Sequence, residues 1–283
     1  MNRAAGCMTL ALSLALPGLA PAEEIEEVLA GAFGRPDIQF VEIEADCRFV
    51  QWGGLARLTF YDRADALTAE YFFPAAPSPC SGPLPVLVGT QAFADLPSAP
   101  DPDFLMPPLL TPGSGKVCFH ATGLRSTCLS YGGFEGDLPF QESPAPYNAP
   151  ELSALGICSL QGVGGTRTNA DYDLLPPSPV NARLQAGSVA VPPRFRDVPA
   201  ASPFQPFAEA LFNAGVTGGC GGGNFCPGSA VTREQMAVFF LLAAEGPAFQ
   251  PPACSAPLFG DVPCSHPFAR WINELARRGI SGG

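Results

Sequence analysis

The chain is poor in charged side chains, in lysine and in histidine. Only 14% of its 283 residues are charged, against about 25% in an average globular protein. Lys116 is the single lysine and the formal net charge is −11, so a phosphate backbone or an anionic lipid surface would repel the chain. This excludes nucleic acid as a partner. Two histidines leave little material for catalytic triads, imidazole metal sites or proton shuttles, and we therefore expect no enzyme and no cofactor.

Long apolar runs are also missing. No stretch approaches the roughly 20 apolar residues of a helix that crosses a bilayer, so we expect no membrane span. The first 22 residues carry Arg3 as their only charge, then an apolar run from Met8 to Leu16 and an Ala-x-Ala ending. This pattern predicts a signal peptide over residues 1–22 and hence a secreted protein; a buried helix is the alternative, but a Pro-Gly pair would break it. The segment at 23–35, which begins with four glutamates in five residues, is then expected to form a solvated acidic leader.

Proline, glycine and cysteine are abundant, with counts of 33, 31 and 10. After loss of Cys7 with the signal peptide, nine cysteines enter an oxidising compartment in which disulfides persist. A zinc site is the rival interpretation, but the sequence has no C-x-x-C, and we expect no metal. Cys158 is left over when the others form the expected pairs, which are Cys220–Cys226, Cys254–Cys264, Cys118–Cys128 and, as the remaining pair, Cys47–Cys80.

Short runs rich in β-branched and aromatic residues, separated by proline and glycine clusters, fill residues 37–134. Six or more strands at this spacing favour a β-sandwich with exposed loops. His120 on one of these strands is interpreted as a packed residue rather than a base. The expected strands lie within residues 37–45, 55–61, 69–73, 85–89, 116–120 and 128–131.

Several of these segments resemble the lamin-tail domain, an immunoglobulin-like sandwich, in the form found in secreted bacterial proteins. Residues 38–43 (Ile-Gln-Phe-Val-Glu-Ile) are similar to its opening strand. Residues 159–161 (Ser-Leu-Gln), 168–173 (Thr-Asn-Ala-Asp-Tyr-Asp) and 177–181 (Pro-Ser-Pro-Val-Asn) are similar to its closing segment, with Gln161 in place of the family's arginine. The resemblance covers residues 36–184 and implies an adhesive or targeting module with no chemistry of its own.

The last ninety residues contain an internal repeat. Residues 195–219 and 259–283 align without gaps at a separation of 64, and ten of the 25 positions are identical. Both copies begin with Phe-x-Asp-Val-Pro and end with Gly-Val-Thr-Gly-Gly or Gly-Ile-Ser-Gly-Gly. Chance does not supply such a match, so the repeat indicates one structural unit that is used twice.

Each copy predicts a short amphipathic helix that ends at a glycine, Gly215 or Gly279. In the first copy a Gly-rich loop follows, and Thr232 and Gln235 then have the spacing of a capping box that begins a second helix. The expected apolar faces of the three helices are Phe204, Phe207, Ala208 and Leu211 on the first, Met236, Phe239, Phe240 and Ala243 on the second, and Phe268, Trp271, Ile272 and Leu275 on the third.

These motifs, together with Val-Thr-Arg-Glu-Gln-Met-Ala at 231–237, resemble the S-layer homology (SLH) domain. The resemblance makes residues 195–246 one SLH repeat and 259–283 a partial repeat, with linkers at 185–194 and 247–258. In that family three repeats form a three-pronged bundle that binds cell-wall polysaccharide, and the arginine of a Thr-Arg-Ala-Glu-like motif lines the groove. The resemblance assigns this role to Arg233, with Thr232 and Glu234 beside it and Asp197 near the repeat start; the motif here is Thr-Arg-Glu-Gln, which departs from the family pattern.

Two alternatives stay open for this region. Thr232 and Gln235 can serve as a helix cap and nothing more, and Arg233 is then an ordinary solvated residue of a first helical turn. One and a half repeats cannot build a three-pronged bundle alone. We therefore expect either an incomplete gene product or further prongs that come from other SLH-bearing chains.

Three other patterns carry less chemistry. Asn169, Asp171 and Asp173 have the spacing of a calcium-binding loop, but alternate aspartates in a turn more often cap backbone N–H groups. The Gly-Ser-Gly-Lys segment at 113–116 lacks two residues of a phosphate loop and is interpreted as a hairpin turn. The only strand carboxylates that could form the pair of a hydrolase are Glu42, Glu44 and Glu70.

The sequence thus predicts a multidomain fold: an all-β immunoglobulin-like sandwich followed by all-α helix-loop-helix SLH repeats. We expect a non-catalytic secreted protein that binds cell-wall polysaccharide at the cell envelope through its repeats and displays the sandwich as an adhesion or interaction module. The alternatives are an accessory module of an extracellular hydrolase and a structural subunit of a surface assembly.

Overall fold

The computed structural model of the chain describes residues 23–121, 126–136, 159–162 and 172–282. It divides into two compact units, Met1–Val191 and Pro192–Gly283. The signal-peptide prediction at 1–22, and with it Cys7, lies outside the described residues, as does Cys158. In the part of the chain that the structure describes, no helix has both the length and the apolar character needed to cross a membrane.

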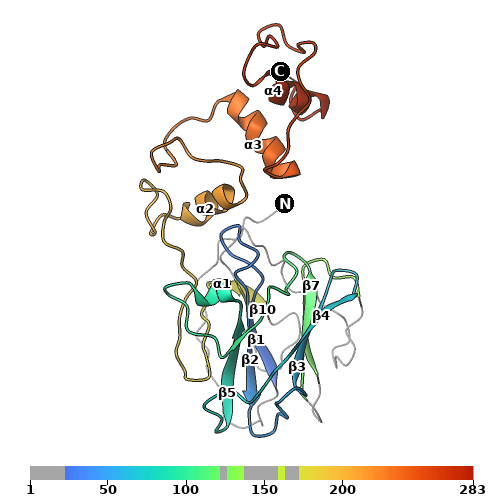
Figure 1. Cartoon of the computed structure of the whole chain (residues 1–283), viewed down its shortest axis with the longest axis vertical. Helices are drawn as coiled ribbons and strands as arrows, with labels where there is room; N and C mark the ends of the chain where they lie inside the picture. Colours follow the sequence, from blue (N-terminus) through green and yellow to red (C-terminus); the bar gives the residue numbers. More distant parts are fainter. Residues whose placement is uncertain (1–22, 122–125, 137–158, 163–171, 283) are drawn as a thin grey trace. The chain divides into compact units, whose positions relative to one another are not determined.

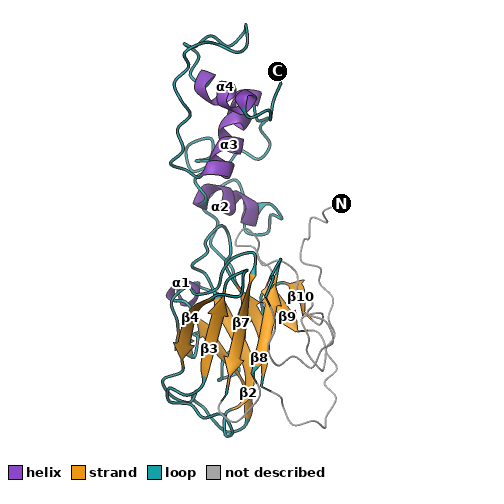
Figure 2. Ribbon diagram, turned by 90° about the vertical axis from the view of Figure 1, so that its right-hand side faces the viewer, coloured by secondary structure: helices purple, strands orange, loops and turns teal. Residues whose placement is uncertain are grey.

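The first unit is built from two β-sheets. Its strands are β1 (Glu24–Leu29), β2 (Phe40–Asp46), β3 (Arg57–Tyr61), β4 (Leu67–Phe72), β5 (Pro83–Gly89), β6 (Phe104–Leu105), β7 (Gly115–His120), β8 (Thr127–Tyr131), β9 (Ser159–Gly162) and β10 (Tyr172–Leu175). The larger sheet has the order β10-β9-β1-β2-β5-β6 and the smaller has the order β4-β3-β7-β8 (Figures 1 and 2). Neighbouring strands are antiparallel, except that β5 and β6 are parallel.

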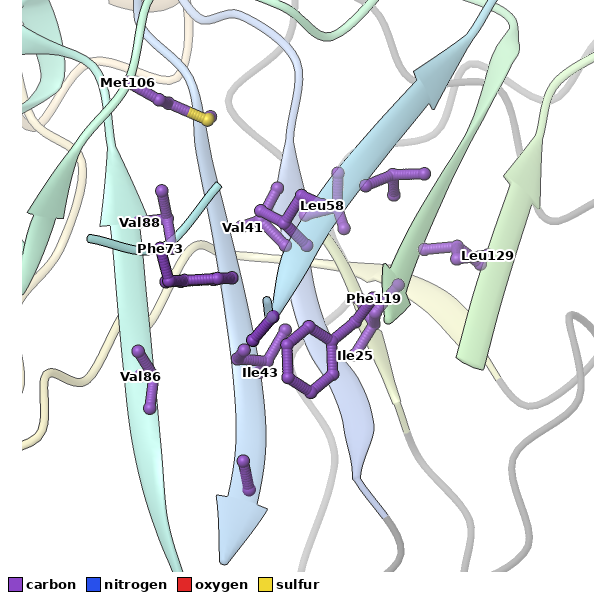
Figure 3. Close-up of a cluster of buried hydrophobic side chains, with 14 of the residues drawn as sticks. Ile25, Val41, Ile43, Leu58, Phe73, Val86, Val88, Met106, Phe119 and Leu129 are labelled. Carbon is purple, nitrogen blue, oxygen red and sulfur yellow. The ribbon is translucent and has the colours of Figure 1, made fainter. Parts of the chain in front are cut away.

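One hydrophobic core lies between the two sheets, and the strands contribute alternate residues to it. Val41 and Ile43 of β2 and Leu58 of β3 are buried in this core (Figure 3). Phe60 of β3 is buried there as well. The two-sheet arrangement confirms the predicted β region, whereas the immunoglobulin-like topology stays a prediction. Phe73 occupies the aromatic centre of the core, with ring centroids between 5.1 and 5.9 Å from those of Trp52, Tyr71, Phe104 and Phe119.

The segment at 23–35 is not a solvated leader, which corrects that expectation. Its residues Glu24–Leu29 form β1, which pairs with β2 on one side and with β9 on the other. Ile25 and Val28 are buried in the shared core, and Glu27 is only 4% exposed. The register shifts between Ile25 and Glu27. Because of this irregularity the acidic and apolar residues do not alternate strictly, and the strand pattern is hidden in the sequence.

The expected linker at 185–194 begins later than the sequence indicates. Val189 is buried in a second apolar cluster with Phe40, Leu87 and Phe93. Phe93 belongs to the short helix α1 (Gln91–Ala94). Residues up to Val191 therefore belong to the first unit, in agreement with the boundary between the two compact units. The sequence shows no periodicity here because the segment packs through single residues rather than through a helix or strand face.

The second unit has, in its described part, the helices α2 (Gln205–Asn213), α3 (Arg233–Glu245) and α4 (Ala269–Arg277). Long loops join them, and the unit has two small cores. The first core contains Phe195, Val198 and Ala208, with Phe212 and Phe225 against them. The second core lies between α3 and α4 and contains Ala237, Leu241 and Leu275, packed against Phe249, Trp271 and Ile272.

The expected apolar face of α3 is wrong, and that of α2 is confirmed only in part. On α2, Ala208 packs in the first core, but Phe204 and Phe207 are 67% and 59% exposed. On α3 the buried residues are Ala237 and Leu241, whereas Phe240 is half exposed. Both helices carry apolar residues on more than one side, so periodicity alone does not identify the side that a neighbour covers. The expected face of α4 does pack, since Trp271, Ile272 and Leu275 contact the second core.

The four predicted cysteine pairs lie at disulfide distance. In the first unit the Cα–Cα distances are 5.6 Å for Cys47–Cys80 and 4.0 Å for Cys118–Cys128. In the second unit they are 6.0 Å for Cys220–Cys226 and 5.3 Å for Cys254–Cys264. The described residues include no free cysteine. Cys118 and Cys128 are opposite each other on the paired strands β7 and β8, and the Cys47–Cys80 bridge spans the part of the chain that contains β3 and β4. In the second unit, Cys220–Cys226 and Cys254–Cys264 close short segments without a helix or strand, so these two bridges restrict backbone that regular structure does not hold.

The aromatic centre of the core gives a direct stability test. We expect Phe73→Ala to lower the free energy of unfolding of the first unit by about 3–5 kcal/mol, because it removes a fully buried ring and leaves a cavity. Urea unfolding followed by circular dichroism measures this loss. Phe72→Ala is the matched control: Phe72 is 48% exposed, and we expect its loss to cost less than about 1 kcal/mol. Equal losses for the two variants would contradict this description of the core.

Candidate functional site

The N-terminus of α3 carries three of the four residues to which the SLH resemblance assigns binding, Thr232, Arg233 and Glu234. Thr232 caps the helix: its Oγ1 accepts the N–H of Gln235 at 3.3 Å, and its own N–H donates to Gln235 Oε1 at 2.9 Å. The capping box that the sequence predicts is therefore present. Thr232 and Gln235 are engaged with each other, so the cap fixes where the first turn begins and leaves the next side chain, Arg233, to solvent.

Arg233 and Glu234 differ in what they contact. Arg233 is exposed and makes no hydrogen bond or ion pair with the described residues. Glu234 Oε2 lies 3.4 Å from His266 Nε2, so the carboxylate pairs with the imidazole whenever that imidazole is protonated. This contact connects the start of α3 to the segment before α4. The carboxylate of Glu234 thus has a neighbour within the protein, whereas the guanidinium of Arg233 donates to none of the described residues and can offer its N–H groups to a ligand.

Asp197 holds the loop of the first repeat. Its two carboxylate oxygens accept the N–H groups of Phe225 and Cys226 at 2.8 and 2.7 Å, and the N–H of Arg196 donates to the carbonyl of Gly223 at 3.0 Å. The N–H of Phe225 is the main cause of the lowered pKa of Asp197. The carboxylate is therefore committed to the backbone of the Gly-rich loop, and the resemblance-based prediction that it contributes to binding gains no support from its contacts.

The two copies of the repeat share their hydrogen bonds. In the first copy Val198 N–H donates to Phe195 O and Ser202 N–H to Pro199 O, at 3.2 and 2.8 Å. In the second copy the equivalent bonds have the same lengths, 3.2 and 2.8 Å, between Val262 and Phe259 and between His266 and Pro263. Both helices then end at a glycine with positive φ, 68° at Gly215 and 71° at Gly279. The two stretches fold alike over their whole described length.

A buried polar side chain inside each first helix is a feature that the sequence analysis missed. Glu209 is 2% exposed and accepts the N–H of Arg194 at 2.7 Å. Asn273, at the equivalent position, is fully buried and accepts the N–H of Leu258 at 3.3 Å. The polar residue fixes the chain that enters each repeat. A carboxylate and an amide at equivalent positions of the two copies, each directly after two apolar residues, were the signal that could have revealed this role.

The three candidate strand carboxylates are divided between the two sheets. Glu42 and Glu44 lie on β2 of the larger sheet, whereas Glu70 lies on β4 of the smaller sheet, where it pairs with Arg57 at 3.1 Å. Glu42 instead stands directly opposite Glu27 of β1. Burial is the main cause that raises the pKa of Glu42 to about 8, with smaller contributions from the charges of Glu27, Glu26 and Glu44, while the N–H of Val180 opposes the rise.

Two further predictions concern His120 and Lys116. His120 lies between Thr59 and Ser126, with ring nitrogens 2.8 and 2.6 Å from the two hydroxyl oxygens. Burial lowers its pKa, followed by the charge of Arg57. Lys116 is a buried residue of β7 that pairs with Asp65 and lies 4.2 Å from the ring centre of Tyr61, so it is unavailable to a phosphate.

The expected calcium loop falls largely outside the described residues. Asn169 and Asp171 are not described, and Asp173 is described only as part of β10. Within the described ranges, no group of three or more histidine, cysteine, aspartate or glutamate side chains is placed to hold a metal ion. The structure therefore does not test the calcium alternative.

Comparison with known families gives one match, which lies within the second unit. The family model of the S-layer homology domain matches residues 194–237, which extend from the start of the first repeat into α3. This match supports an SLH domain protein and includes Asp197, Thr232, Arg233 and Glu234. SLH domains typically bind cell-wall polysaccharide, and their presence implies association with the cell surface. No curated protein and no solved structure matches the chain. The lamin-tail resemblance of residues 36–184 stays a prediction.

The role of Asp197 can be tested against its own repeat equivalent. We expect Asp197→Ala to speed amide hydrogen exchange at Phe225 and Cys226, because both N–H groups lose their acceptor. Asp261→Ala is the control, since Asp261 occupies the same position in the second copy and makes no side-chain hydrogen bond within the described chain. A loop that exchanges equally fast in the wild type and in Asp197→Ala would show that the carboxylate does not hold it.

Proposed function

We propose that the protein is exported and is anchored to the cell envelope through its SLH repeats, which bind a cell-wall polysaccharide. The observation that carries this proposal is the exposed Arg233 at a rigidly capped helix start within the SLH match. A positive side chain at a helix N-terminus is unfavourable for the helix itself. Its position is therefore better explained by a ligand than by helix stability.

The chemistry of this helix start suits an anionic or hydroxyl-rich polymer. A guanidinium offers five N–H donors in a planar fork, and it forms paired hydrogen bonds with carboxylates and phosphates. The backbone N–H groups of a first helical turn favour negative charge in the same place. Glu234 would oppose an anion, but its contact with His266 turns part of that charge toward the protein.

The first unit is proposed to act as a non-catalytic interaction module. The separation of Glu42 and Glu70 on different sheets argues against a paired-carboxylate hydrolase. Buried lysine, buried carboxylates and two disulfides instead give a rigid scaffold with loops at its ends. An accessory role beside an extracellular hydrolase is compatible with the same scaffold, whereas turnover of cell-wall glycan by the purified chain would mean that the chain is itself a hydrolase.

The anchoring proposal is tested by pull-down on purified cell-wall glycan. We expect Arg233→Ala to weaken binding roughly ten- to hundredfold, since a hydrogen bond to a charged group contributes about 1.5–3 kcal/mol. Arg277→Ala is the matched control: it removes the same charge from the exposed C-terminal turn of α4. We expect this control to bind like the wild type.

The other outcomes of this experiment are equally informative. Equal losses in Arg233→Ala and Arg277→Ala would mean that net charge, not a site, determines binding. A different result would favour the alternative of a structural surface-assembly subunit, in which SLH repeats pair between chains. In that case the wild-type protein would not bind the glycan but would self-associate in analytical ultracentrifugation.

A further inference from the structure

A proline-interrupted segment, residues 178–182, crosses the outer face of the larger sheet and is called the strap below. Alternate residues of the strap donate their backbone N–H groups to carboxylates on β1, on β2 and directly before β6. Ser178 donates to Glu27 at 3.0 Å, Val180 to Glu42 at 2.7 Å and Ala182 to Asp103 at 2.8 Å. The strap thus pairs with side chains where a strand would pair with another strand.

The sequence of the strap explains this arrangement. Residues 177 and 179, on either side of Ser178, are prolines and have no N–H to offer. A segment with alternate prolines cannot complete a sheet ladder, but its remaining N–H groups can point to one side. The carboxylates accept them there. Asn181 fixes the end of the strap: it is fully buried, and its side chain donates to Asp101 O at 2.9 Å.

Two of the three carboxylates are neighbours on the sheet. Glu27 and Glu42 are directly opposite each other on β1 and β2, and they are 4% and 8% exposed. Side chains at such positions stand about 5 Å apart at Cβ. Two ionised carboxylates at this separation repel each other, and their charge is poorly solvated beneath the strap. One proton on the pair removes the repulsion and still leaves an acceptor for each N–H group.

We infer that the strap is a pH-dependent latch, which lies closed on the sheet while the Glu27 and Glu42 pair holds a proton and opens more often as that proton is lost. The groups around Glu42 are Glu27 and Glu26 on β1 and Glu44 on its own strand, and the strap itself presents the N–H of Val180. Arg183 follows the strap and interacts with Asp103. The N–H of Val180 favours the ionised form of Glu42, whereas burial and the three neighbouring glutamates favour its protonated form and together outweigh it.

The direction of the pH effect follows from linkage. The pKa of Glu42 is raised to about 8 with the strap closed, and it falls toward its ordinary value near 4 when an open strap admits water. The closed state then binds a proton that the open state releases. Closure is fully favoured below the open-state pKa and weakens as pH rises toward about 8. Burial also raises the pKa of Asp103, which acts in the same direction.

Amide hydrogen exchange of the full-length chain tests the latch. We expect the opening equilibrium of residues 178–184, after correction for intrinsic exchange rates, to rise by up to roughly tenfold per pH unit between about pH 5.5 and 7.5. In Glu42→Gln the amide keeps an acceptor for Val180 and cannot ionise, so the slope should vanish. Glu70→Gln is the control and should keep the wild-type slope, because Glu70 lies on the smaller sheet, pairs with Arg57 and contacts no strap N–H.

An internal reference separates the strap from the rest of the unit. The amide of Phe119 in β7 should show no such rise with pH, since a global loss of stability would affect both segments. Wild-type protection of residues 178–184 that is the same at both ends of the pH range overturns the latch. A Glu42→Gln slope equal to that of the wild type also overturns it, and the wild-type comparison decides the matter alone if the variant fails to fold.

Discussion

Much of the irregular backbone in this protein depends on side-chain acceptors for its N–H groups. A buried N–H group without an acceptor costs about 1–3 kcal/mol, and a chain with 33 prolines has many segments that cannot complete a ladder or a helix. Carboxylates supply the missing acceptors in both units. In the first unit, Glu42 accepts a backbone N–H of the strap. In the second unit, Asp197 holds the Gly-rich loop of the first repeat, and Glu209 fixes the chain that enters this repeat. The same kind of contact therefore stabilises parts of the molecule that share no fold.

These contacts also change the meaning of the net charge. Glu27, Glu42, Asp46 and Glu209 are all buried, and with its pKa raised to about 8 Glu42 is mostly protonated at neutral pH. Part of the formal charge of −11 therefore comes from acidic residues that are buried and cannot contact a partner. Composition remains a sound argument about the whole chain. It overstates how strongly the surface of the β unit repels an anionic polymer.

The features that the sequence predicted well are those that depend on neighbouring residues or on the comparison of two copies. The capping box of Thr232 joins residues three apart, and the repeat shows itself through identical residues at a fixed separation. The features it missed depend on distant partners. Strand β1 is recognisable only beside β2 and β9, and the contact of Glu234 with His266 requires α3 and the segment before α4 to be packed together. The position of Arg233 was therefore predictable, whereas its lack of a hydrogen-bond or ion-pair partner among the described residues was not.

The packing of α3 against α4 explains why the same stripe behaves differently in the two repeats. On α4, Trp271 and Leu275 are covered by Ala237 and Leu241 of α3, the second helix of the preceding repeat. On α2, the equivalent Phe207 and Leu211 are 59% and 40% exposed, because no described helix stands before α2 in the same relation. Repeats of this kind bury their apolar faces against neighbours rather than within themselves. The exposure of the α2 stripe is thus a consequence of its place in the repeat order, while the shared hydrogen bonds that shape each copy are independent of that place.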